Sequence, residues 1–286
     1  MIQLLAASLL WAFSFGLIKG QLAGLDPVAV SCGRLVLAAV AFAPFVLRSS
    51  VPRRVVGPAL GLGMLQFGLM YVLYIYSYRW LPAWMVALFT IFTPLYVVLF
   101  SDWLDRRFRA RHLLCAFLAV AGAAVVVATA MPAGADWKGI VLLQGANLCF
   151  AMGQVLFVRL KRRAEGREAG LLGWMYLGAA LFTLVAVVVR MAGGIQPLEG
   201  WHGGAWWTLL YLGLLPTALG FYLFNKGAAR VGAGVLASAN NLKVPLAVLV
   251  SWLVFGEEAA YGRVLIGLVV IVGALFLARP RPRART

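Results

Sequence analysis

The sequence is built from long apolar runs separated by short polar connections. Ten of these runs have about 20 residues each, the length that an α-helix needs to cross the hydrocarbon core of a bilayer. The chain is 63% hydrophobic and 12% charged, whereas soluble domains are roughly half apolar and about a quarter charged. The pattern therefore predicts an all-α membrane protein with ten transmembrane helices. The predicted spans are residues 2–20, 28–47, 55–77, 83–104, 112–130, 138–158, 170–190, 204–224, 233–255 and 263–279.

Lys and Arg gather on alternate connections. If the N-terminus is cytoplasmic, 18 of the 25 basic residues fall on the cytoplasmic side, in segments 48–54, 106–111, 159–167, 226–230 and 279–285. The positive-inside rule then predicts that both termini are cytoplasmic. The same clusters account for the net charge of +16 without a nucleic-acid partner, because they form no stripe on one soluble face.

The two halves of the sequence resemble each other at a shift of 151 residues. The matching pairs are Tyr71 and Tyr222, Arg79 and Arg230, Pro94 and Pro245, Val97 and Val248, and Gly122 and Gly273. We expect two five-helix repeats, residues 1–131 and 132–286. Because five is odd, the second repeat would enter the membrane from the opposite side. Inverted repeats typically enclose a central substrate site in secondary transporters, although an inherited duplication without transport is an alternative.

Polar and aromatic side chains inside the predicted spans mark the candidate site, because polar groups in hydrocarbon usually face a cavity or another helix. They come from several spans and comprise Trp11, Ser14, Gln66, Tyr74, Tyr78, Thr90, Thr93, Asn147, Gln154, Asn240, Asn241 and Lys243. Other roles stay open. The amides can simply link helices, the Thr hydroxyls can bond to their own helix, and the tyrosines can form an interfacial belt.

Two basic residues lie within predicted spans. Lys243 is about ten residues into its span, close to the midplane, and Pro245 leaves the carbonyl of Asn241 without its helical partner. These features predict that Lys243 lines a cavity, with an amine held by backbone carbonyls as the alternative. Arg34 is a turn or two from the outer end of its span, where it either snorkels to the surface or gates an outer vestibule.

The acidic residues restrict the mechanism. All nine lie in predicted connections or at span ends, so no carboxylate is expected at the midplane to carry a proton or sodium ion. The chain has 2 His and 3 Cys, without metal-ligand spacing. We expect no catalytic residues, no metal and no cofactor, and hence no enzyme.

Several motifs lead to a known family. The second half contains Trp207-x3-Tyr211-Leu-Gly-Leu-Leu-Pro-Thr217, Leu242-Lys-Val-Pro245 and Trp252-Leu-x2-Gly256-Glu257. The first half contains Trp11-x-Phe13, Thr93-Pro94 and Trp103-Leu-Asp-Arg106. This pattern resembles the EamA-type drug/metabolite transporters, which include YddG-like amino-acid exporters. The resemblance implies ten helices around a central cavity, a bacterial inner-membrane location, and export of amino acids or related metabolites.

Residues and resemblance together predict a secondary transporter of a small carboxylate-bearing metabolite, with an amino acid as the first expectation. It would work by alternating access in the lipid bilayer, as a monomer or weak dimer. The substrate carboxylate would meet Lys243, Asn240 and Asn241, and its apolar part would pack on Trp11 and the tyrosines. Export of cationic or hydrophobic drugs held by aromatic side chains is the alternative, and a receptor or assembly subunit is a more distant one.

Overall fold

The computed structural model describes most of the first half of the chain and part of the second. The described residues are 2–48, 51–106, 134, 136–165 and 167–228, with 246–247, 250–256, 262 and 269 near the C-terminus. Every regular element in these residues is helical. The prediction of an all-α chain is therefore confirmed for the part of the sequence that the structure describes.

Seven helical segments within the described residues are long and apolar enough to cross a membrane. They are Ile2–Leu22, Pro27–Arg48, Arg53–Ser77, Ala83–Leu104, Trp137–Arg163, Glu168–Ala192 and Gly203–Gly227. Each coincides with a predicted span to within a few residues. The other three predicted spans, 112–130, 233–255 and 263–279, fall wholly or mainly outside the described residues. A total of ten spans and the inverted arrangement of the repeats therefore remain predictions.

Four of the spans combine α-helix with tighter or wider turns. The elements are α1 (Ile2–Leu17) with η1 (Ile18–Leu22); α2 (Pro27–Arg48); α3 (Arg53–Gly63), η2 (Met64–Leu69) and α4 (Met70–Ser77); α5 (Ala83–Phe89), η3 (Thr90–Phe92) and α6 (Thr93–Leu104); α8 (Trp137–Arg163); α9 (Glu168–Ala192); and α10 (Gly203–Leu212), η4 (Gly213–Leu219) and α11 (Gly220–Ala228). The segments η1, η2 and η4 are π-helical, and η3 is a 3₁₀ turn.

The π-helical segments η2 and η4 occur at related positions. A shift of 151 residues carries Met64–Leu69 onto residues 215–220, which overlap Gly213–Leu219. Such insertions are rare in α-helices and are frequent at functional sites. The spans Arg53–Ser77 and Gly203–Gly227 thus carry the same local interruption, as copies of one ancestral helix would.

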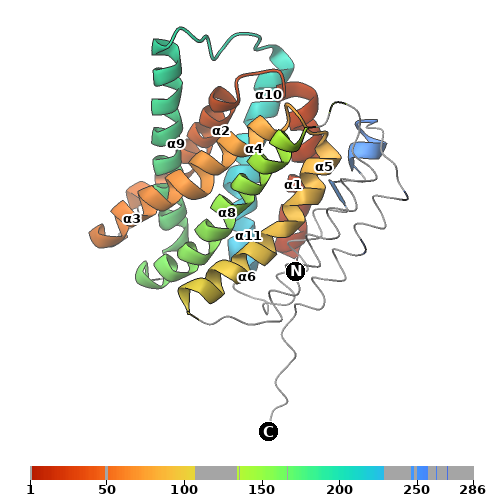
Figure 1. Ribbon diagram of the computed structural model, residues 1–286. Helices are drawn as coiled ribbons and strands as arrows, with labels where there is room; N and C mark the ends of the chain where they lie inside the picture. Colours follow the sequence, from red (N-terminus) through yellow and green to blue (C-terminus); the bar gives the residue numbers. More distant parts are fainter. Residues whose placement is uncertain are drawn as a thin grey trace.

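The helices form one bundle in which α9 packs against α2 and α3, α8 against α4 and α6, and α1 against α11 (Figure 1). Two glycines allow α3 and α9 to approach closely. A Cβ atom on Gly63 would lie 1.9 Å from the carbonyl oxygen of Met175, and one on Gly178 would lie 2.2 Å from that of Leu60. Small residues at such crossings are typical of helix packing in membranes.

The second half of α9 is apolar and exposed. Leu184, Val185, Val188 and Val189 are each about half exposed or more, whereas Leu171, Met175 and Tyr176 in the first half are buried. Exposed aliphatic side chains on a membrane span suit contact with lipid tails. The bundle therefore presents a bilayer-facing surface along the second half of α9.

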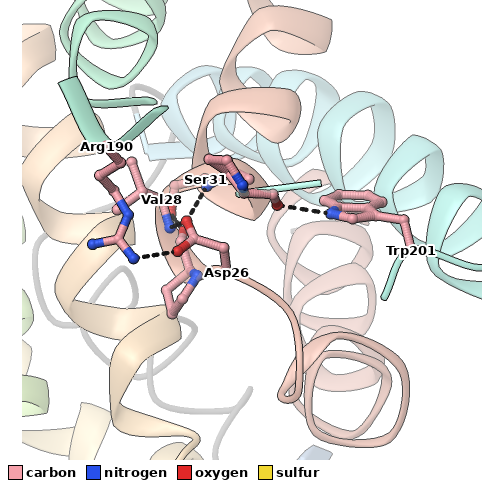
Figure 2. Close-up of polar contacts among 8 residues, drawn as sticks. Asp26, Val28, Ser31, Arg190 and Trp201 are labelled. Carbon is pink, nitrogen blue, oxygen red and sulfur yellow. Dashed lines mark hydrogen bonds and ion pairs between the residues drawn. The ribbon is translucent and has the colours of Figure 1, made fainter. Parts of the chain in front are cut away.

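The two ends of the bundle differ in polarity. The basic segments at the end of α2, the beginning of α3, the end of α6 and the end of α8 lie at one end, and the α9–α10 connection crosses the other (Figure 1). At this second end Asp26 caps α2, because its carboxylate accepts hydrogen bonds from the backbone amides of Val28 and Ala29 at 3.0 Å. The same carboxylate pairs with Arg190 of α9 at 2.6 Å (Figure 2). This contact ties the beginning of α2 to the end of α9.

Candidate functional site

A cavity of about 80 Å³ lies inside the bundle and is lined by both halves of the chain. Trp11 lies about 14 Å along its span at 1.5 Å per residue, close to the middle of a hydrocarbon core about 30 Å thick. The described lining residues are Trp11, Ser14 and Phe15 of α1, Arg34 of α2, Met70, Tyr71 and Tyr74 of α4, Thr90 of η3, Thr93 of α6, Ala146, Asn147 and Phe150 of α8, and Phe221 of α11.

Most of the predicted site residues in the described part of the chain meet at this cavity. The lining includes Trp11, Ser14, Tyr74, Thr90, Thr93 and Asn147. Sequence analysis did not single out Met70, Ala146, Phe150 and Phe221, which are apolar residues without a distinguishing local pattern. Asn240, Asn241 and Lys243 lie outside the described residues, so their predicted role is untested.

Arg34 is buried in the cavity wall, so the predicted snorkelling to the surface is wrong. The residue is 2% exposed. Its Nε donates a hydrogen bond to Thr217 Oγ1 at 2.5 Å, and its Cζ lies 4.1 Å from the centroid of the Tyr71 ring. Snorkelling does not fit this position, and the role of an outer gate stays a prediction. The side chain turns inward because a hydroxyl and an aromatic face, both from other helices, replace part of its hydration.

One nitrogen of Arg34 has no partner among the residues that the structure describes. Within them Nη1 is buried and forms no hydrogen bond, and Arg34 takes part in no ion pair. Buried polar groups are nearly always hydrogen-bonded, and leaving one unpaired costs about 1–3 kcal/mol or more when it is charged. An unpaired guanidinium nitrogen in a cavity wall is therefore a candidate anchor for an anionic ligand.

Thr217 is available to Arg34 because of the π-helical turn η4. Pro216 has no amide hydrogen, so the normal i→i−4 bond to the carbonyl of Leu212 cannot form. The Thr217 hydroxyl donates to that carbonyl at 2.8 Å and accepts from Arg34. The carbonyls of Pro216 and Thr217 accept at 2.9 Å from Trp11 Nε1 and from the Tyr176 hydroxyl, respectively. The turn is thus held by side chains of α1, α2 and α9.

The opposite wall is held by Asn147. In the 3₁₀ turn η3 the amide of Thr93 bonds to the carbonyl of Thr90, so the carbonyl of Phe89 loses its usual i+4 partner. Asn147 Nδ2 donates to that carbonyl at 2.9 Å and to Gln144 Oε1 at 3.2 Å, and Thr93 Oγ1 donates to Asn147 Oδ1 at 3.3 Å. Asn147 therefore lines the cavity and links α8 to the broken α5–α6 span at the same time.

Aromatic rings supply the apolar part of the wall. The ring centroid of Phe221 lies 5.2 Å from that of Trp11 and 5.7 Å from that of Phe150. The rings of Phe15 and Tyr74 meet edge to face at 6.2 Å. Such rings offer large rigid contact surfaces to an apolar ligand.

Three predicted residues do not belong to the described lining. Gln66 is 2% exposed and lies against Gly153, where an added Cβ would meet its side chain at 2.4 Å. Tyr78 is fully buried, and its hydroxyl bonds to that of Tyr74 at 2.7 Å. Gln154 is half-buried on α8. Because Tyr71, Tyr74 and Tyr78 are all buried, the alternative of an interfacial tyrosine belt is wrong.

The electrostatics of the cavity favour an anion. Among its described lining residues there is no carboxylate, and Arg34 brings a positive charge. The sequence-based expectation gave this deep charge to Lys243. In the described part of the chain the guanidinium of Arg34 fills that role, on a different helix.

Comparison with known proteins agrees with this architecture. The EamA-like transporter family matches residues 1–128 and 137–279. The chain belongs to this family. The resemblance noted in the sequence is thereby confirmed, as is the expectation that the protein is a membrane transporter and not an enzyme.

Relatives of this EamA-like transporter carry a more specific name. A probable biotin transporter of Pseudomonas aeruginosa is 40% identical over 279 residues, covering 96% of each chain. The biotin transporter of Escherichia coli K12 is 32% identical over 281 residues, covering 98% of this chain and 93% of its own length. These relatives give no support to the predicted amino-acid specificity.

A solved crystal structure has the same fold. It superposes with a TM-score of 0.67 at 21% identity and covers 97% of this chain and 95% of the other. The likeness shows that the chain has a known fold.

Proposed function

We propose that this EamA-like transporter carries biotin across the inner membrane of a bacterium. Biotin joins a carboxylate on a flexible aliphatic chain to a compact bicyclic ring that carries a ureido group. The relatives named as biotin transporters support this substrate. The predicted preference for a carboxylate-bearing metabolite is kept, and biotin replaces an amino acid as its first candidate.

The unpaired Nη1 of Arg34 carries the proposal. A carboxylic acid of this kind is ionised at neutral pH, and a carboxylate accepts charge-assisted hydrogen bonds from a guanidinium fork. Arg34 has five N–H donors, of which Nε is used by Thr217. Binding the carboxylate at Nη1 would satisfy a buried donor that the cavity leaves open.

The rest of the cavity wall suits the end of biotin that is opposite the carboxylate. The bicyclic ring and aliphatic chain would pack on Trp11, Phe150 and Phe221. The hydroxyls of Ser14 and Thr90 are within the lining and bond to carbonyls of their own helix, so they keep lone pairs that can accept from the two ureido N–H groups. Recognition at both ends would distinguish biotin from a simple fatty acid.

The cavity must widen to admit this substrate. Its volume of about 80 Å³ is well below the roughly 300–1,000 Å³ of typical ligand pockets. Alternating access supplies such widening, since one bundle rocks against the other around the site. The side-chain bonds between the two halves of the chain, from Arg34 to Thr217 and from Asn147 to Phe89, are the ones that this motion would loosen.

The rival substrate class, cationic drugs, is disfavoured by the same residue. A cation would enter a cavity whose described lining holds a buried guanidinium and no carboxylate. Its stacking on Trp11 and Phe221 would have to exceed that repulsion.

Counterflow into proteoliposomes tests the proposal independently of the transport direction. Vesicles holding the purified protein and unlabelled biotin are diluted into labelled biotin, and the transient accumulation of label is followed. We expect accumulation above that of protein-free vesicles. Unlabelled biotin should compete, whereas its methyl ester should compete weakly and a mixture of amino acids should not. Accumulation of labelled amino acids or of a lipophilic cation, with none of biotin, would refute the proposed substrate.

A further inference from the structure

A second hollow lies on the outside of the bundle, between α3 and α8. This α3–α8 groove has a volume of about 380 Å³ and shares no lining residue with the central cavity. Its apolar part is formed by leucines of α3, η2 and α8, namely Leu62, Leu65, Leu156 and Leu160. The beginning of α3 and the end of α8 lie at the same end of the bundle (Figure 1), where the groove also reaches Arg159 and Arg163.

The groove exists because α3 has small side chains on this side. Gly61 lines it and is exposed. A Cβ atom built on Gly61 would meet no other atom within 4 Å, so open space continues to the backbone. From Pro58 to Leu65 the helix rises by about 10 Å. The groove therefore follows the helix for about two turns into the apolar part of the span.

The charged end of the groove has guanidinium N–H donors that the ion pairs among the described residues do not use. Arg159 and Arg163 are four residues apart on α8 and so lie on one face. Arg159 Nη2 pairs with Asp105 at 2.6 Å, in a contact in which both side chains are about half exposed. Arg163 is exposed and takes part in none of the ion pairs among the described residues. An anion at this end would meet one free guanidinium and the remaining donors of a second.

We propose that the α3–α8 groove binds an anionic phospholipid of the bilayer, with an acyl chain along the leucines and the phosphate group at Arg163 and Arg159. Both helices are long and apolar enough to cross a membrane, and the exposed Gly61 leaves the apolar part of the groove open at the surface of the bundle. The arginines stand at the end that carries the basic segments, which the positive-inside rule assigns to the cytoplasm. The cytoplasmic leaflet is rich in anionic lipids, and basic pockets between helices on that side bind their head groups. A soluble anion would use the arginines but not the leucines.

Native mass spectrometry of the full-length protein tests this binding. The protein is delipidated in detergent and mixed with phosphatidylglycerol or phosphatidylcholine, and the bound lipids are counted. Arg163→Gln removes the free charge, and Arg162→Gln removes an exposed charge of the same turn that does not line the groove. Gly61→Phe fills the groove without changing the charge. Its control is Gly57→Phe, since Gly57 also faces open space but lies outside the lining.

We expect wild type to retain phosphatidylglycerol in preference to phosphatidylcholine. Arg163→Gln should lower phosphatidylglycerol retention to the phosphatidylcholine level, and Gly61→Phe should abolish it, while the two controls bind like wild type. Equal retention of both lipids by wild type would overturn the proposal. So would equal losses in Arg163→Gln and Arg162→Gln, which would indicate non-specific attraction to the basic cluster. A protein dimer that survives delipidation and is lost in Gly61→Phe would assign the groove to a second copy of the chain instead.

Discussion

Arg34 offers the sharpest test of how the cavity recognises its substrate. Replacing Arg34 with Gln removes the buried charge and keeps a polar side chain that can still donate to Thr217. Replacing biotin with its methyl ester removes the complementary charge from the ligand. Measuring both ligands on both proteins gives a cycle in which the coupling between guanidinium and carboxylate is isolated from each separate change.

The size of the effect follows from the burial of Arg34. The residue is 2% exposed, so solvent screening is small. A hydrogen bond to a charged group contributes about 1.5–3 kcal/mol, and a factor of ten in affinity corresponds to about 1.4 kcal/mol. The dissociation constant for biotin should therefore rise by about 10- to 150-fold in Arg34→Gln. For the neutral ester, the guanidinium can still donate but the attraction between opposite charges is absent, so the dissociation constant should rise by a smaller factor than for biotin.

Isothermal titration calorimetry in detergent measures the four dissociation constants. Arg34→Lys keeps the charge and should recover part of the affinity. Arg54→Gln, which changes an exposed arginine at the beginning of α3, should bind like wild type. If Arg34→Gln weakens the binding of biotin and of its methyl ester by the same factor, Arg34 supports the cavity wall through Thr217 and does not bind the carboxylate.

Three further predictions concern the packing that holds the site. Gly63→Ala places a methyl group against the backbone of α9 and should lower the free energy of unfolding in mixed micelles by about 1–3 kcal/mol. The control Gly57→Ala meets open space and should not lower it. Equal unfolding free energies of the two variants would contradict the close contact between α3 and α9. Thr217→Val leaves the Nε of Arg34 without its hydroxyl partner and should cost about 1–3 kcal/mol, measured by thermal unfolding. Thr217→Ser should stay near wild type, and a stable Thr217→Val protein would show that the hydroxyl is dispensable. Asp26→Ala removes both the cap of α2 and the ion pair with Arg190 and should cost at least the roughly 0.5–2 kcal/mol of a helix cap. Asp26→Asn keeps the cap and should lose less by the same unfolding assay, so equal losses would remove the cap from the explanation.

Much of the architecture is a local property of the chain, and the sequence alone predicts it. The span Ile2–Leu22 was predicted as 2–20 and Arg53–Ser77 as 55–77. These predictions agree with the structure because the length and apolarity that a helix needs to cross a bilayer depend only on consecutive residues. The candidate site is also partly local. Thr93 and Asn147 are polar groups inside apolar runs, and Trp11 is a bulky one. Exposing a polar group to lipid is energetically unfavourable, so such residues are expected to turn inward toward a shared cavity.

The direction of a buried polar side chain is less predictable, as Gln66 illustrates. Gln66 was included in the site because a polar side chain inside a span faces either a cavity or another helix. Polarity alone does not choose between these two outcomes. Gln66 packs against Gly153 of a neighbouring helix, whereas Tyr74 reaches the cavity.

The direction of Arg34 was decided by tertiary structure alone. Its sequence position, a turn or two from a span end, allows the side chain either to reach the surface or to stay inside. The choice depends on Thr217, which is 183 residues away and lies directly after Pro216 in the π-helical turn η4. The sequence by itself determined which segments cross the membrane and that polar groups gather between them. The tertiary structure decided which charged side chain lines the cavity. A charge stays buried only where other side chains replace its water, and for Arg34 those side chains come from distant helices.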